Sequence, residues 1–175
     1  MAGIFDNISR WMDEEIVMFD ESVSRFLASK APPERLQRWR HDGIVEREAW
    51  EEMAEAGLLG LSIAPEFGGA GGDFRHEAIL IRRLGVAGAE GWGVPLHNAI
   101  CGAYIQKYGT PEQQARWLPG IVSGRYITAI AMTEPGTGSD LQGIRTTARP
   151  SGNGYAINGQ KTFISNGQQA NLIIV

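Results

Sequence analysis

The stretch AMTEPGTGSD, residues 131–140, lies where the pattern of the chain changes from helical to extended. It predicts a strand that ends at Thr133 and runs into a loop with two glycines and small hydroxyl side chains. Closely spaced glycines let backbone N–H groups approach an anion without interference from Cβ atoms. Ser139 can add a hydroxyl donor, and Thr133 can offer its hydroxyl to a polar ring atom of a ligand. The residues alone therefore predict a loop for a phosphate-bearing ligand, with a long hairpin loop as the alternative.

Before this stretch, apolar residues recur every three or four positions, which is the spacing of amphipathic helices. The first helical stripe consists of Phe5, Ile8, Met12, Ile16, Phe19, Val23 and Phe26. Pro32-Pro33 ends this helix, because proline lacks a backbone donor and restricts the residue before it. Shorter helices are expected around Leu36 and Trp39, over residues 46–56, and over residues 74–87.

Two more helices are expected before the pattern changes. One face of the first carries His97, Ile100, Cys101, Tyr104, Ile105 and Tyr108. The second starts at Thr110-Pro111-Glu112-Gln113, which has a capping threonine, proline at the first helical position and a glutamine that completes a capping box. We expect this helix to end before Pro119 and one more turn to precede Gly124.

After Gly124 the sequence is rich in β-branched and aromatic residues, which favours strands. The expected strands are residues 125–133, 144–149, 155–158, 161–165 and 171–175. Gly152-Asn153-Gly154 is expected to join the second strand to the third, and Asn158-Gly159 is a further hairpin turn. The fold class is therefore α+β, with a helical domain over residues 1–123 and the opening of an antiparallel, barrel-like β domain over residues 124–175. The apolar run Leu172–Val175 has no turn or polar cap after it, so we expect the chain to be a truncated piece.

Composition excludes several classes of protein. The 175 residues carry 16 Lys and Arg against 20 Asp and Glu, and this net charge of −4 argues against a nucleic-acid-binding protein. One cysteine, Cys101, cannot build a disulfide scaffold, and we expect no metal site. The acidic N-terminus is unlike a secretory signal, and no apolar run is long enough to span a bilayer, so we expect a soluble, cytoplasmic protein.

Other candidate features favour structural roles. The glycine-rich residues 66–73 match neither the P-loop nor the dinucleotide-binding fingerprint, so we expect a tight structural loop. His97 can line an acyl pocket, but a packed or surface histidine is the favoured alternative, and Cys101 is expected to be buried. The arginine clusters are interpreted as solvated faces, and they contain Arg35, Arg38, Arg40, Arg82 and Arg83.

The motifs together resemble those of the acyl-CoA dehydrogenase flavoprotein family. The resemblance is carried by residues 57–72, 108–113, 131–148 and 155–167, and is closest in look to long-chain-type members. It implies a FAD-dependent enzyme that oxidises an acyl-CoA thioester to its trans-2-enoyl form. A carboxylate base removes the α-proton, and a hydride passes from the β-carbon to flavin N5.

The resemblance also implies roles for particular residues. Ile130, Ala131, Met132 and Thr133 should run beside the flavin ring, with the Thr133 hydroxyl near N5. Gly138 and Ser139 should approach the pyrophosphate, with Ser139 also near the CoA moiety. Phe163, Ile164 and Ser165 should flank the flavin, although the family often has Trp and Thr at the two outer positions. Thr137 is a mild departure, because the family more often has a smaller residue there.

The family's catalytic glutamate lies in a C-terminal helical domain that this chain lacks, so no residue here is assigned a catalytic role. Glu134 belongs to the loop motif and is expected to be structural. We expect the fragment alone to be inactive and the full-length enzyme to be a homo-oligomer that passes electrons to an acceptor such as an electron-transfer flavoprotein. The alternatives are an acyl-CoA oxidase or flavin monooxygenase of the same fold, or a non-catalytic helical interaction module.

Overall fold

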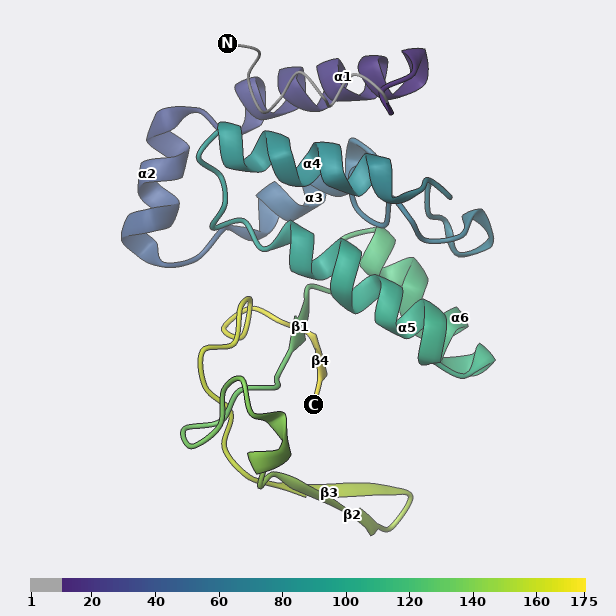
Figure 1. The fold of residues 1–175 in the computed structure, drawn as a ribbon, viewed down its shortest axis with the longest axis vertical. Helices are drawn as coiled ribbons and strands as arrows, with labels where there is room; N and C mark the ends of the chain where they lie inside the picture. The colour runs from purple at the N-terminus through teal and green to yellow at the C-terminus, as the bar shows by residue number, and fades with distance from the viewer. Residues whose placement is uncertain (1–10) are drawn as a thin grey trace.

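The computed structural model describes residues 11–175 of the chain. Its helices gather at one end of the molecule, and the β segments extend from them at the other end (Figure 1). The predicted α+β class, a helical half followed by the start of a β half, is confirmed. Phe5 and Ile8, the first two positions of the predicted helical stripe, lie outside the described residues. No helix in residues 11–175 is long and apolar enough to cross a bilayer.

The helical part follows the predicted order closely. Its elements are α1 (Glu14–Lys30), α2 (Pro33–Asp42), α3 (Arg47–Glu55), the short 3₁₀ helix η2 (Pro65–Phe67), α4 (Phe74–Val86), the π-helical segment η3 (Leu96–Gly102), α5 (Ala103–Tyr108) and α6 (Pro111–Val122). Asp13 caps α1 by accepting from the Ile16 N–H at 3.0 Å. The capping box predicted at Thr110 and Gln113 is present at the start of α6.

Two details of these helices differ from prediction. Helix α6 continues through Pro119 to Val122, because Leu118 and Ile121 on either side are fully buried and their packing offsets one missing backbone hydrogen bond. The predicted single face of η3 and α5 is in fact divided between two sides. His97, Cys101 and Ile105 face the core, whereas Ile100, Tyr104 and Tyr108 are exposed.

The main core lies between α1, α3 and α4. Helices α1 and α4 lie side by side (Figure 1). Trp50 and Trp92 are fully buried, and the Trp92 ring meets Trp39 edge to face with centroids 5.0 Å apart. A second cluster of Ile63, Ile105, Leu118 and Ile121 packs against Leu172 and Ile174, and so joins the helical part to the end of the chain.

The arginine clusters are only partly solvated. Arg38 and Arg40 are exposed, as predicted, whereas the prediction is wrong for the partly buried Arg35, Arg82 and Arg83. Asp20 of α1 is 7% exposed and accepts hydrogen bonds from Arg82 at 2.7 Å and from Arg83 at 2.6 Å. Arg35 is bound by Glu46 and Glu52, each at 2.6 Å. Sequence spacing could not reveal these pairs, because none of them joins two residues of the same helix.

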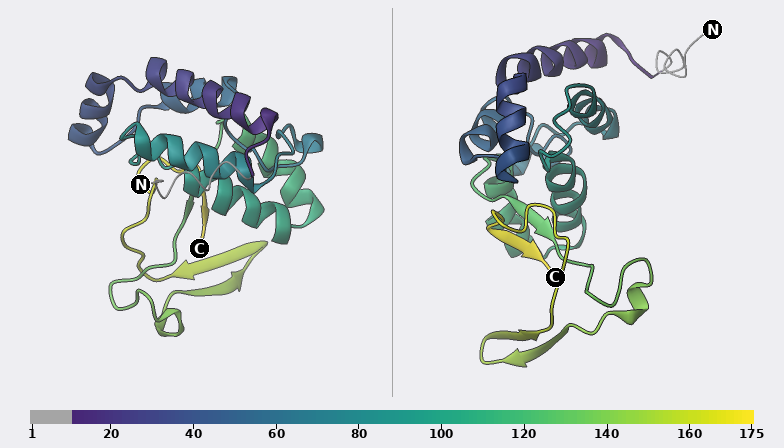
Figure 2. Two further views of the ribbon diagram at one scale, coloured as in Figure 1. Left: turned by 45° about the horizontal axis from the view of Figure 1, so that its top comes forward. Right: turned by 90° about the vertical axis from the view of Figure 1, so that its left-hand side faces the viewer.

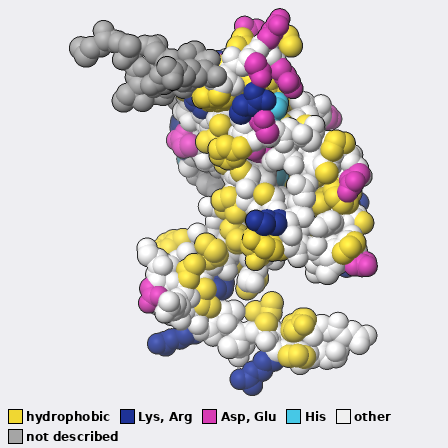
Figure 3. Space-filling view, turned by 45° about the vertical axis from the view of Figure 1, so that its right-hand side comes forward, with side chains coloured by type: hydrophobic (Ala, Val, Ile, Leu, Met, Phe, Trp, Pro, Cys, Tyr) yellow, Lys and Arg dark blue, Asp and Glu magenta, His cyan; other side chains and the backbone are white. Residues whose placement is uncertain are grey.

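The β part consists of β1 (Thr128–Ile130), the 3₁₀ turn η4 (Leu141–Gly143), β2 (Thr147–Ser151), β3 (Gly154–Asn158) and β4 (Leu172–Ile174). Strands β2 and β3 form an antiparallel hairpin through Gly152 and Asn153, as predicted. Figure 2 shows this hairpin at the end of the molecule far from α1. Its residues are exposed, including Tyr155 and Ile157, and hydrophobic side chains are visible on its surface (Figure 3).

Other strand predictions were wrong. Residues 161–165 form no strand, and Asn158-Gly159 is no hairpin turn. A Cβ atom at position 159 would lie 2.2 Å from Thr146 Oγ1, so Gly159 serves a close approach of two segments. Strands β1 and β4 pair in parallel, with Thr128 opposite Leu172, rather than antiparallel. The long connection between them allows this, because parallel neighbours need a crossover.

The buried ion pairs of Asp20 give a stability prediction. Asp20→Ala should lower the free energy of unfolding by about 1–3 kcal/mol, because two arginines lose their shared carboxylate. Hydrogen bonds from Arg83 and Arg82 hold the pKa of Asp20 below its ordinary value of 3.8, against the effect of burial. The loss, measured by urea denaturation, should therefore shrink as the pH falls below that value.

The neighbouring Glu21→Ala is the matched control, because the Glu21 side chain is 63% exposed and its contact with Arg25 is 3.6 Å long. It should cost less than about 0.5 kcal/mol. Equal losses for the two variants would contradict a special role of Asp20.

Candidate functional site

The predicted site begins where β1 ends. The Ala131 N–H donates to the Ile174 carbonyl at 2.7 Å, so the strand remains anchored to β4 up to this residue. Ala131 is buried, Thr133 is half-buried and Met132 is 46% exposed. The Thr133 carbonyl accepts from the Thr162 N–H at 3.0 Å, which places the segment before Phe163 directly beside the end of the strand.

The glycine loop turns sharply and remains open. Glu134 and Thr137 exchange two backbone hydrogen bonds of 3.0 Å, which close a tight turn over Pro135 and Gly136. At Gly138, a Cβ atom would meet no atom within 4 Å, and Ser139 is exposed. Asp140 accepts from the Gln142 N–H at 3.2 Å, as expected for a side chain that holds its own loop. The loop is therefore open at Gly138 and Ser139, whereas the side chains of Glu134 and Thr137 are buried.

Glu134 fixes this loop to the rest of the β part. Its carboxylate accepts from the backbone N–H groups of Arg145 at 2.8 Å and Thr146 at 2.9 Å, and from Lys161 Nζ at 3.0 Å. Lys161 also donates to the Met132 carbonyl at 3.0 Å. The neighbouring Thr146 side chain, the two backbone donors and Lys161 lower the pKa of Glu134 to about 2. These contacts support the structural role predicted for Glu134. Lys161 was not identified from the sequence as a partner of Glu134.

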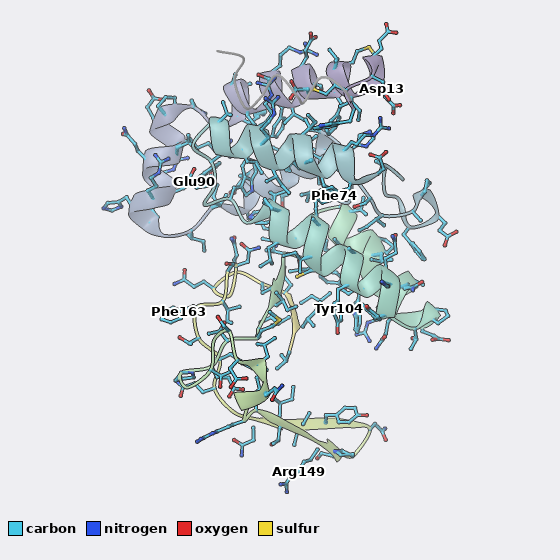
Figure 4. All side chains as sticks on the ribbon, in the orientation of Figure 1. Asp13, Phe74, Glu90, Tyr104, Arg149 and Phe163 are labelled. Carbon is cyan, nitrogen blue, oxygen red and sulfur yellow. The ribbon has the colours of Figure 1, made fainter. Side chains whose placement is uncertain are left out.

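The segment that follows presents an aromatic side chain outward. Phe163 is 92% exposed and has a left-handed backbone with φ of 55°. Figure 4 shows it among the loops of the β part. Such a conformation costs about 1–3 kcal/mol for a non-glycine residue and is often found at functional sites. Ile164 is half-buried and Ser165 is exposed.

A cavity of about 580 Å³ meets this segment from the helical side. Its walls include Trp39, Arg40 and Glu90, and its other side is the loop Ile164–Gln169. Of the predicted site residues it contacts Ile164 and Ser165, but none of residues 130–139. The described residues thus bring Thr133 next to the Phe163 segment, but they do not enclose all predicted site residues in one pocket.

Two other candidates have structural roles. His97 is fully buried, its Nε2 lies 3.1 Å from the Ile121 carbonyl, and its Nδ1 accepts from the Thr128 N–H at 3.2 Å. Burial lowers the pKa of His97 to about 4, so the ring is neutral at pH 7 and the packed alternative is confirmed. Cys101 is buried, as predicted.

The glycine-rich residues 66–73 are a structural loop, as expected. The backbone N–H groups of Gly71 and Gly72 donate to the carbonyls of Ile63 and Leu61 at 2.9 and 2.8 Å, so they are not available to a phosphate. A Cβ atom at position 69 would lie 2.1 Å from the Ile63 carbonyl oxygen, which explains the glycine there.

The structure thus has a helical part that leads into an open glycine turn and short strands. Comparison with known proteins shows which family has this arrangement. Residues 13–125 match the family model described as "Acyl-CoA dehydrogenase, N-terminal domain", and residues 129–175 match "Acyl-CoA dehydrogenase, middle domain". The chain belongs to the acyl-CoA dehydrogenase family, and the resemblance seen in its sequence is confirmed.

Individual proteins support the same assignment. The mitochondrial long-chain specific acyl-CoA dehydrogenase of Mus musculus is 43% identical over 168 residues, which are 96% of this chain and 39% of that protein. The crystal structure of an acyl-CoA dehydrogenase from Geobacillus kaustophilus has a TM-score of 0.89 at 44% identity, over 94% of this chain and 43% of its own. The crystal structure of an acyl-CoA dehydrogenase from Bacillus anthracis complexed with FAD has a TM-score of 0.86 at 32% identity. The match covers 94% of this chain and 29% of that chain. The chain thus spans about two fifths of the mouse relative.

The carboxylate of Glu134 gives a prediction on pH. Glu134→Gln should destabilise the loop and increase amide hydrogen exchange at Arg145 and Thr146, because a neutral amide replaces an ionised acceptor. The depressed pKa means that the carboxylate stabilises the fold above its ordinary pKa of 4.5 and loses this effect as the pH falls toward about 2. The difference in stability between the two proteins should be constant from pH 8 to pH 5 and should shrink below that range.

Glu66→Gln, on an exposed turn, is the control and should leave the exchange at both amides unchanged. A Glu134→Gln variant with the same exchange pattern as the unmodified chain would show that this carboxylate does not hold the loop.

Proposed function

We propose that this chain forms the N-terminal helical domain and the first part of the β domain of a FAD-dependent acyl-CoA dehydrogenase. The reaction is the α,β-dehydrogenation of an acyl-CoA thioester to trans-2-enoyl-CoA. The observation that supports it best is the open turn at Gly138 and Ser139. This turn follows Thr133, three residues after the end of β1, and the Thr133 carbonyl is hydrogen bonded to the segment of the exposed Phe163. The domain division at residues 123 and 124 is part of the same proposal.

The residues present fit FAD in their chemistry. Gly138 has free space where a side chain would be, so backbone N–H groups and the Ser139 hydroxyl are available to a diphosphate. Thr133 supplies a hydroxyl for the polar edge of the flavin, and Ile130, Ala131 and Met132 are proposed to run beside it. Phe163, Ile164 and Ser165 supply an aromatic face, an apolar contact and a hydroxyl. When bound, FAD supplies the hydride acceptor of the reaction.

Substrate binding and proton transfer divide between this chain and other parts of the protein. We propose that Ser139 also contacts the CoA moiety. No residue of the chain is proposed as the base, and Glu134 is unsuited to that role, because its carboxylate is already held by Arg145, Thr146 and Lys161. The base is proposed to lie in a C-terminal helical domain outside this chain.

The partners are proposed at the level of chemical class. A long-chain acyl-CoA is the proposed substrate, an electron-transfer flavoprotein the proposed acceptor, and a homo-oligomer the proposed assembly. Oxygen consumption with acyl-CoA would instead favour an acyl-CoA oxidase or flavin monooxygenase. A protein that binds no flavin would favour a helical interaction module. The cytoplasmic location stays a prediction that cell fractionation can test.

The glycine turn gives a direct test of cofactor binding. In the full-length protein, Gly138→Asp should abolish FAD binding, because it places a carboxylate where the diphosphate is proposed to lie. Binding is measured by the flavin absorbance of the purified protein. The control is Gly154→Asp in the β2–β3 hairpin, where a side chain also meets no atom within 4 Å. Normal FAD content in the Gly138→Asp protein would overturn the proposed role of this turn.

The division of the active site gives a second test. The 175-residue chain alone should not reduce an electron acceptor in the presence of an acyl-CoA, because the proposed base is outside it. Turnover by the isolated chain would contradict this division.

A further inference from the structure

The loop after Phe163 is fixed by one amide side chain. Asn166 Nδ2 donates to the Thr128 carbonyl at 3.1 Å and to the Gly93 carbonyl at 3.3 Å. Thr128 is the first residue of β1, whereas Gly93 precedes η3 in the helical part. The side chain of Asn166 therefore joins the loop to both parts of the molecule.

The contact with the helical part requires a glycine. A Cβ atom at position 93 would lie 2.2 Å from Asn166 Oδ1 and 2.8 Å from its Nδ2. Gly93 is not among the glycines with a left-handed backbone, so its own conformation does not explain the residue type. The close approach of the Asn166 amide explains why this residue is a glycine.

The backbone of Asn166 also holds the loop. Its φ is 63°, a left-handed conformation that asparagine tolerates better than most residues. Its carbonyl accepts from the N–H groups of Gln169 at 3.0 Å and Ala170 at 2.9 Å. Asn166 is thus fixed both through its side chain and through its main chain.

Phe163 depends on this support. Its backbone is also left-handed, and its side chain is 92% exposed, so packing of its own ring does not hold it in place. Before Phe163, the segment is anchored by the hydrogen bond from the Thr162 N–H to the Thr133 carbonyl. After Phe163, it is anchored by the hydrogen bond from Asn166 Nδ2 to the Thr128 carbonyl. Both anchors lie on β1 or on the residues that continue it.

We propose that Asn166 is a positioning residue that sets the orientation of Phe163–Ser165 against Thr133. Its role toward a flavin rests on the proposed function, whereas its role in the loop does not. Thr128, its partner on β1, is itself held by the buried His97, with Thr128 Oγ1 2.9 Å from His97 Nδ1. The orientation of the segment is thereby tied to the core of the helical part.

Three substitutions test the proposal in the 175-residue chain. Asn166→Asp keeps the shape and the tolerance of a left-handed backbone but removes the Nδ2 donor. Asn166→Gly removes the whole amide, and Gly93→Ala displaces it without changing the sequence of the loop. Each should raise amide hydrogen exchange over residues 162–166 by on the order of tenfold. Gln168→Ala, an exposed neighbour in the same loop, is the control and should change nothing.

A double substitution separates the contact from general destabilisation. Gly93→Ala should have little further effect in the Asn166→Gly background, because the amide that it displaces is already gone. Additive effects of the two substitutions, or unchanged exchange in all three single variants, would overturn the proposal. Using Asn166→Asp beside Asn166→Gly keeps the test valid if one variant fails to fold.

A readout on FAD then tests the positioning role itself. In the FAD-loaded full-length protein, Asn166→Asp and Gly93→Ala should change the visible circular dichroism of the flavin and shift its midpoint potential, whereas Gln168→Ala should not. Unchanged flavin signals together with increased exchange would overturn the role toward the flavin. A full-length protein that takes up no FAD would refute the proposed function, and the exchange measurements would still decide whether Asn166 holds the loop.

Discussion

The short strand β1 is the element on which the rest of the β part depends. The first residue of β1 is Thr128. Its N–H donates a hydrogen bond to the His97 ring, and its carbonyl accepts one from the Asn166 side chain. On its other side the strand pairs with β4. Three residues of strand cannot be stable in isolation, so these contacts with a buried ring, a loop and a late strand are what keep it in place. Of the proposed ligand contacts, Ile130 is on this strand and Ala131, Met132 and Thr133 continue directly from it.

Two kinds of polar contact surround the proposed site. Glu134 and Lys161 hold the glycine turn through charge, and the low pKa of Glu134 keeps the carboxylate ionised at any physiological pH. Asn166 holds the Phe163 segment through a neutral amide. Together they keep Gly138, Ser139 and Phe163 exposed while their neighbours are fixed. A site whose contact groups remain open needs such support, because the contact groups cannot pack to hold themselves.

The helical part contributes rigidity more than chemistry. Its buried tryptophans belong to the main core, the ion pairs of Asp20 join α1 to α4, and the cluster around Leu118 and Ile121 joins α6 to β4. The buried polar side chains of this part that the sequence marked as candidates, His97 and Cys101, are packed rather than open. The two family models divide the chain in the same order, because the N-terminal domain model matches the helical residues 13–125 and the middle domain model matches residues 129–175.

The sequence by itself determined the helices, their caps, the β2–β3 turn and the family, because these depend on residues close together in the chain or on whole motifs. The capping box at Thr110 and the glycine turn are examples. Only the tertiary structure decided the rest: the continuation of α6 through Pro119, the parallel pairing of β1 and β4, the partners of Asp20 and the close contact between Asn166 and Gly93. Each of these joins residues or surfaces distant in sequence or depends on burial, and local periodicity contains no information on which distant group will be the partner.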